Sequence, residues 1–81
     1  MHFMEHYQQA LLQAFPESDV TIEGGGAKFI ARVISDAFAG KNKVARHRAV
    51  YGVLQEYIAS GEIHALNIEA LTPDEAASQR Q

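Results

Sequence analysis

Three consecutive glycines, Gly24 to Gly26, separate two segments in which apolar and polar side chains alternate. In the first segment, residues 20–23, Val20 and Ile22 fall on the same side of an extended chain. The second, residues 28–34, is rich in β-branched and aromatic residues, which strands prefer. Glycine allows the positive φ angles that a tight reversal requires. The pattern therefore predicts a β-hairpin whose strands each bury one face.

A long amphipathic segment separates this hairpin from a third alternating segment. The segment predicts a main helix over residues 43–60. Its predicted apolar face consists of Val44, Val50, Tyr51, Leu54, Tyr57 and Ile58. The third strand is predicted over residues 63–71, and a strand that returns after a helix pairs in parallel through a right-handed crossover. With a first helix over residues 2–14, this order predicts an α+β fold: a three-stranded mixed sheet covered by helices on one face.

Capping residues mark the starts of the remaining helices. Ser35 precedes a predicted single helical turn, and Asn42 precedes the main helix. Thr72 and Glu75 have the spacing of a capping box, with a proline between them at the first helical position. They predict a short last helix. We expect residues 76–81 to fray, as chain ends commonly do.

Length and composition exclude several classes of protein. The chain has 81 residues, which predicts a single domain over residues 1–81. It has no cysteine, so it cannot supply a disulfide, a thiolate ligand or a thiol nucleophile. No apolar run approaches the roughly 20 residues of a membrane span. Residues 1–14 resemble neither a signal peptide nor a transit peptide. We therefore expect a cytoplasmic protein that does not bind membranes.

Positive charge is concentrated immediately after Gly40. Four of the seven basic residues lie in eight positions there, without an acid among them: Lys41, Lys43, Arg46 and Arg48. The net charge of −3 disfavours a dedicated nucleic-acid binder. A local basic patch can nevertheless attract a phosphate backbone or an acidic protein, and helix-start N–H groups can hold an anion. The segment is either a solvated helix start or a docking surface for a negative partner.

The four histidines are candidate ligands. His2 and His6 lie one helical turn apart, but the sequence places no third ligand beside them, which favours an incidental role. His47 falls within the apolar stripe of the main helix, so we expect it to pack against the sheet; the alternative is a ligand or a proton-responsive residue. His64 opens the third strand, where a rigid backbone would hold it within reach of a partner.

No group of residues in the sequence predicts catalysis. The serines fall in predicted turns, caps or the tail, without a histidine partner implied by spacing. The glycine run is followed by a strand and not by a helix, so it does not form a phosphate-binding loop. We expect a protein without enzymatic activity.

Several short motifs occur together and in order along nearly the whole chain. They are Ser35-Asp36-Ala37-Phe38, Gly40-Lys41, Val44, Arg46-His47-Arg48, Val50-Tyr51, Ile63-His64-Ala65-Leu66 and Leu71-Thr72-Pro73-Asp74-Glu75. In this combination and spacing the chain resembles the BolA family. The resemblance implies an αββαβ core like that of class II KH domains. It also implies a chain that is monomeric or weakly homodimeric by itself.

The resemblance further implies a role beside monothiol glutaredoxins in the assembly, trafficking or sensing of [2Fe–2S] clusters. In such pairs the glutaredoxin and its glutathione supply thiolates, and the BolA-like protein supplies a histidine. The family's histidine corresponds to His64 here, and imidazole can replace thiolate on one iron. The implied cofactor is a cluster shared with the partner, absent from the isolated chain.

The chain departs from the family pattern in two loops. Family members often carry a second ligand, Cys or His, between the first two strands, where residues 23–28 contain neither. The alternatives for the second ligand are Glu23, a solvent molecule and His47. A further alternative is that no stable shared cluster forms. The Gly-x-x-Gly loop of KH domains is also incomplete, because Lys43 stands three residues after Gly40. This departure weakens the case for clamping single-stranded nucleic acid.

Two functional hypotheses follow from the residues and the resemblance. The first is an adaptor that binds a monothiol glutaredoxin through His64 and the basic residues 41–48. The basic segment would then be an electrostatic docking surface for an acidic protein or its bound glutathione. The second is a DNA-binding transcriptional regulator with a helix-turn-helix-like segment. Its contact residues would be Gly40, Lys41, Lys43, Arg46 and Arg48.

Overall fold

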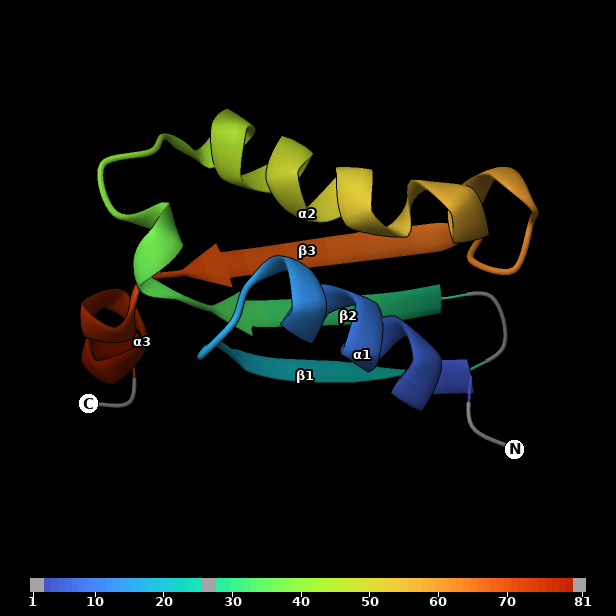
Figure 1. Ribbon diagram of the computed structural model, residues 1–81, viewed down its shortest axis with the longest axis horizontal. Helices are drawn as coiled ribbons and strands as arrows, with labels where there is room; N and C mark the ends of the chain where they lie inside the picture. The colour runs from blue at the N-terminus through green and yellow to red at the C-terminus, as the bar shows by residue number, and fades with distance from the viewer. Residues whose placement is uncertain (1–2, 26–27, 80–81) are drawn as a thin grey trace.

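The computed structural model describes residues 3–25 and 28–79 and places three helices around one small sheet (Figure 1). The elements are α1 (Phe3–Ala14), β1 (Asp19–Gly25), β2 (Lys28–Ile34), the 3-10 turn η1 (Asp36–Phe38), α2 (Lys43–Ala59), β3 (Ala65–Leu71) and α3 (Pro73–Gln79). The predicted α+β class with an αββαβ core is confirmed, and α3 follows that core.

The sheet has the strand order β1-β2-β3, with β1 antiparallel and β3 parallel to β2. Both the predicted hairpin and the predicted crossover are therefore confirmed. Gly25 pairs with Lys28, and Lys28 pairs with Ala65. The β1–β2 connection and the start of β3 consequently lie at the same end of the sheet. Gly26 and Ala27, at the tip of the predicted turn, lie outside the described residues.

The core lies between one face of the sheet and the two long helices. Its buried members are Tyr7, Leu11, Val20, Ala31, Val33, Phe38, Val50, Leu54 and Ile63. Along β2, Ala31 and Val33 are fully buried, while Ile30, the residue before Ala31, is 45 % exposed. This period of two is expected for a strand covered on one side only. Arg32 and Glu69 form an ion pair of 2.9 Å on the opposite face.

The buried stripe of α2 is narrower than the sequence predicts. Val50 and Leu54 are buried, but Val44 and Tyr51 of the predicted apolar face are 59 % and 39 % exposed. Each residue advances about 100° around a helix, so both side chains point roughly 100° or more away from Val50. A three-stranded sheet shared with α1 covers only the stripe centred on Val50 and Leu54. The predicted apolar face of the main helix is therefore wrong at Val44 and Tyr51.

The last helix is better ordered than the expected frayed tail. Thr72 N–H donates to Glu75 Oε1 at 2.9 Å, and Glu75 N–H donates to Thr72 Oγ1 at 3.2 Å. This capping box is as predicted. Ala76 is buried and α3 continues to Gln79, so the predicted fraying is wrong for residues 76–79; residues 80 and 81 lie outside the described part. None of the described helices is both long and apolar enough to cross a membrane.

Candidate functional site

His64 is exposed and lies in the loop between α2 and β3. The residue before it, Ile63, is fully buried in the core, and its N–H donates to the Tyr57 carbonyl at 3.1 Å. The residue after it, Ala65, pairs with Lys28 of β2. The backbone is therefore held on both sides of His64, while its imidazole is open to a partner. The exposure of His64 agrees with the prediction, but the strand begins at Ala65 and not at Ile63, so His64 precedes the third strand instead of opening it.

A tyrosine from the first helix reinforces this loop, and the sequence pattern alone does not indicate it. Tyr7 is buried, and its hydroxyl donates to Glu62 Oε1 at 3.1 Å. Burial raises the pKa of the Tyr7 hydroxyl, and the hydrogen bond to the Glu62 carboxylate raises it further. The hydroxyl thus remains a donor at neutral pH. The contact ties α1 to the loop two residues before His64, across 55 positions of sequence.

The histidines and carboxylates in the described part of the chain do not form a complete ligand set for a metal ion. Among the described residues, no three histidines or carboxylates gather closely enough to hold a metal ion. His6 is exposed on α1 with its ring edge against Tyr57, and His2 lies outside the described residues. The donor set at this end therefore fits one imidazole contribution to a shared cluster. The remaining ligands would have to come from a partner.

The basic residues lie at the opposite end of α2 from His64. The helix begins at Lys43 and ends at Ala59, and it runs antiparallel to β3 beside it (Figure 1). Seventeen residues of helix extend about 25 Å, and β3 extends about 20 Å. A partner that contacts both His64 and the basic residues has to span this length. The two predicted parts of the adaptor surface are therefore separate features.

His47 is exposed, so the expectation that it packs against the sheet is wrong. It lies near the start of α2, where its ring stacks on Tyr51 with centroids 6.1 Å apart. Twelve residues of helix, about 18 Å, separate it from Ala59 at the other end. One cluster therefore cannot bind both His47 and His64 of the same chain. This geometry removes His47 from the alternatives for a second ligand to that cluster.

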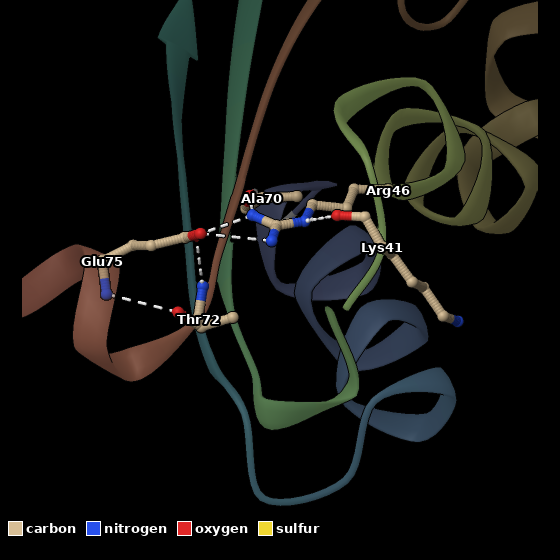
Figure 2. A network of polar contacts seen from close by, with 5 residues as sticks. All are labelled: Lys41, Arg46, Ala70, Thr72 and Glu75. Atoms are coloured by element: carbon tan, nitrogen blue, oxygen red, sulfur yellow. Dashed lines mark hydrogen bonds and ion pairs between the residues drawn. The ribbon is translucent and has the colours of Figure 1, made fainter. Parts of the chain in front are cut away.

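Arg46 is the centre of a polar network that joins α2, β3 and α3 (Figure 2). Its guanidinium donates to both carboxylate oxygens of Glu75, at 2.6 and 3.2 Å, and to the Ala70 carbonyl at 3.2 Å. Its Nε–H donates to the Lys41 carbonyl at 2.8 Å. The side chain is only 14 % exposed. The predicted partner contact by Arg46 is therefore not supported, because its charge and donors are already used within the fold.

The Arg46 guanidinium controls the ionisation of Glu75. Its hydrogen bonds to the carboxylate, together with the N–H of Thr72, lower the pKa of Glu75 to about 2. The same carboxylate thus serves as helix cap and as ion-pair partner. The sequence indicates Glu75 as a cap but not its ion pair with Arg46, since 29 positions separate the two residues.

Three predicted binding residues remain available to a partner. Lys41, Lys43 and Arg48 are exposed, and no ion pair involves them within the described part of the chain. Gly40 has a φ of 78°, so it supplies the left-handed turn that leads into α2. Asn42 caps the helix by accepting the N–H of Ala45 at 2.8 Å, as predicted. The turn and the cap therefore hold the start of α2 while the cations extend into solvent.

Comparison with known proteins gives consistent matches over nearly the whole chain. A family model described as BolA-like protein matches residues 5–75. A protein of Acinetobacter guillouiae, described by its place in the rpoN-murA intergenic region, is 44 % identical over 71 residues, covering 88 % of this chain and 86 % of that protein. The acid stress protein IbaG of Escherichia coli K12 is 38 % identical over 74 residues, covering 91 % and 88 % respectively.

The fold also resembles that of solved structures. The structure of BolA1 from Arabidopsis thaliana aligns with a TM-score of 0.79 and 31 % identity, covering 88 % of this chain and 92 % of that one. Family match, sequence identity and fold therefore agree with each other.

Proposed function

Because this chain belongs to the BolA-like family, we propose that it is an adaptor that binds a monothiol glutaredoxin and takes part in the assembly, trafficking or sensing of [2Fe–2S] clusters. The observation that carries the proposal is the position of His64. Its imidazole is exposed, and its backbone is held between the buried Ile63 and the paired Ala65. A rigidly presented imidazole can ligate one iron of such a cluster. The cysteine-free chain needs its partner for the thiolates.

The proposal is tested by co-expressing the chain with a monothiol glutaredoxin and recording the visible spectrum of the purified complex. We expect a coloured heterodimer whose spectrum changes in His64→Ala. His47→Ala is the matched control, because His47 is also exposed but lies at the other end of α2. Its spectrum should equal that of the parent complex.

The possible outcomes separate the binding role from the ligand role. An unchanged spectrum and unchanged affinity in His64→Ala would overturn the assignment of His64. A colourless heterodimer would support the adaptor and contradict the shared cluster. Failure of the two proteins to co-purify would overturn the proposal as a whole.

DNA binding is a second candidate, favoured by the exposed cations at the start of α2. Lys41, Lys43 and Arg48 can contact phosphates, whereas Arg46 is held by Glu75. Three contacts predict that log K falls with log salt at a slope of about −2.7, at about 0.9 per phosphate. The measurement is duplex binding by fluorescence anisotropy over a series of salt concentrations. Binding no tighter than about 10⁻⁴ M at physiological salt, for every sequence, would count against a regulator.

A further inference from the structure

A groove of about 850 Å³ follows the second half of β3 and opens beside the start of α2. Its walls are formed by the start of α2, with Lys41, Lys43, Arg46 and His47, by residues 67–71 of β3, by α3 and by Ile30 of β2. The groove is distant from His64, which precedes the first residue of β3. It is also large enough for several residues of an extended chain, as ligand clefts of about 300–1,000 Å³ are.

The free edge of β3 contributes backbone hydrogen-bonding groups to this groove. β3 is an edge strand, and β2 is its neighbour in the described sheet. The Leu71 carbonyl accepts the N–H of Ser35, so Leu71 directs its backbone groups towards β2. In a strand the next such residues are two apart, so Leu66, Ile68 and Ala70 direct theirs to the free edge. Among the described residues, the Arg46 side chain reaches this edge, at the Ala70 carbonyl.

The edge lacks the features that usually prevent strand addition. The pairing with β2 runs without a bulge from Ala65 to Leu71. β3 contains no proline, and its charged residue, Glu69, is paired with Arg32 on the outer face of the sheet. Natural edge strands are commonly protected by lysine, proline, bulges or a covering segment. Apart from Ala70, whose carbonyl accepts from Arg46, this edge can therefore act as a template for another extended chain.

The charge of the groove selects the kind of chain that fits. Its two glutamates are already neutralised, Glu69 by Arg32 and Glu75 by Arg46. Lys41 and Lys43 on the opposite wall are exposed, and the Lys41 side chain points away from the Arg46 network (Figure 2). The groove is therefore positive on a protein whose net charge is −3. Complementarity of charge points to an acidic occupant.

We propose that this groove binds an extended acidic segment of a partner protein, which joins the sheet beside β3 as a fourth strand. Alternate backbone groups of the segment would pair with Leu66 and Ile68, and its acidic side chains would face Lys41 and Lys43. Exposed Ile30 would receive an apolar side chain from the segment's other face. The inference goes beyond the proposed function, since it concerns the end of the molecule far from His64.

Single-stranded nucleic acid is less well matched to the same groove. Proteins that bind single strands without sequence preference commonly offer aromatic side chains on which the bases stack. His47 supplies the aromatic ring of the groove wall, and that ring already stacks on Tyr51. The groove offers backbone partners instead, and these suit a peptide.

The test uses the full chain and three labelled nine-residue peptides. The first alternates valine and glutamate, the second alternates valine and lysine, and the third is the first with N-methyl groups on alternate residues. We expect the acidic peptide to bind at least about tenfold more tightly than the other two, measured by fluorescence anisotropy. Binding should also slow hydrogen exchange at the amides of Leu66 and Ile68, because these become hydrogen-bonded.

A pair of protein variants separates the groove from general electrostatics. Lys43→Glu should weaken the acidic peptide about tenfold, whereas Lys28→Glu, the same change at an exposed lysine outside the groove, should leave affinity unchanged. Equal binding of the N-methylated peptide would overturn strand addition. Tighter binding of an oligo-dT strand at equal salt would assign the groove to nucleic acid. Slowed exchange at Leu66 and Ile68 in concentrated protein without peptide would assign it to a second copy.

Discussion

Individual side chains in this protein serve either the fold or a partner, and contacts between distant residues decide which. Arg46 and Lys43 lie three positions apart in one basic segment. Arg46 is 14 % exposed with its donors committed to Glu75, Lys41 and Ala70, whereas Lys43 is exposed. Because both groups are charged, the hydrogen bonds between Arg46 and Glu75 are stronger than hydrogen bonds between neutral groups. Part of the apparent docking charge is therefore a structural connection between α2 and α3.

Substitution of Glu75 by glutamine should make stability depend less on pH. The pKa of Glu75 is about 2 in the folded protein and near its ordinary 4.5 in the unfolded chain. Its charged form thus stabilises the fold above pH 4.5, and this contribution is lost as the pH falls towards 2. Glutamine keeps an oxygen to accept the Thr72 N–H but carries no charge. We expect Glu75→Gln to unfold at lower urea than the parent at pH 7 and at a similar concentration near pH 2.

Asp74→Asn is the control for this measurement, because Asp74 is an exposed acid in the same turn of α3. Its midpoint should differ little from the parent at either pH. If Glu75→Gln and the parent differ by the same amount at pH 7 and pH 2, the ion pair does not account for the difference.

Two glycines, Gly24 and Gly52, affect the elements in which they lie in different ways. Gly24 in β1 has a φ of 153°, and a Cβ there would overlap the carbonyl oxygen of Lys28. Gly52 in α2 has no atom within 4 Å of such a Cβ. One glycine therefore allows close approach of β1 and β2, and the other only weakens its helix. The same residue type thus has opposite effects in two elements.

Alanine at these two glycines should change stability in opposite directions. Gly24→Ala should lower the free energy of unfolding by about 1–3 kcal/mol, because the added methyl group displaces the β2 backbone. Gly52→Ala should raise it by about 0.5–1 kcal/mol, since alanine is the better helix former. Urea unfolding followed by circular dichroism measures both. A neutral Gly24→Ala would show that the hairpin tolerates a side chain at this position.

On the scale of the whole molecule, two accessible features lie at opposite ends of β3. His64 precedes the strand, and Lys41 and Lys43 lie beside its last residues, about 20 Å away. The core between them is shared by the sheet, α1 and α2. Residues this far apart without a common partner usually contribute independently to binding. The molecule can therefore present a ligand at one end and a docking edge at the other.

Changes at the two ends should be independent of each other. His64→Ala should alter the acidic peptide's affinity by less than about twofold, which is the usual limit of about 0.3–0.5 kcal/mol for distant sites. The double variant His64→Ala, Lys43→Glu should lose as much peptide affinity as Lys43→Glu alone. The measurement is peptide anisotropy with all three variants. A loss in the double variant that is several-fold larger would show coupling along β3.

Much of this architecture could be predicted because the signals are local. The alternation of Val20 and Ile22, the glycine run, and the caps at Asn42 and Thr72 act within a few residues, so the sequence indicates the elements directly. The accessible position of His64 also follows from local order, because the residue lies between a glycine turn and a strand. Ligation by His64 remains a prediction, which rests on the family and on the exposed position of the imidazole.

The sequence by itself determined the order of the elements, the hairpin, the capping box and the family to which the chain belongs. Tertiary structure alone decided which charges are free and which faces are covered. Arg46 meets Glu75 across 29 positions, and Tyr7 meets Glu62 across 55. His47 lies in the apolar stripe of the sequence but is exposed beside the groove. Local periodicity indicates an element and its polarity, whereas only packing determines how much of its surface another element covers.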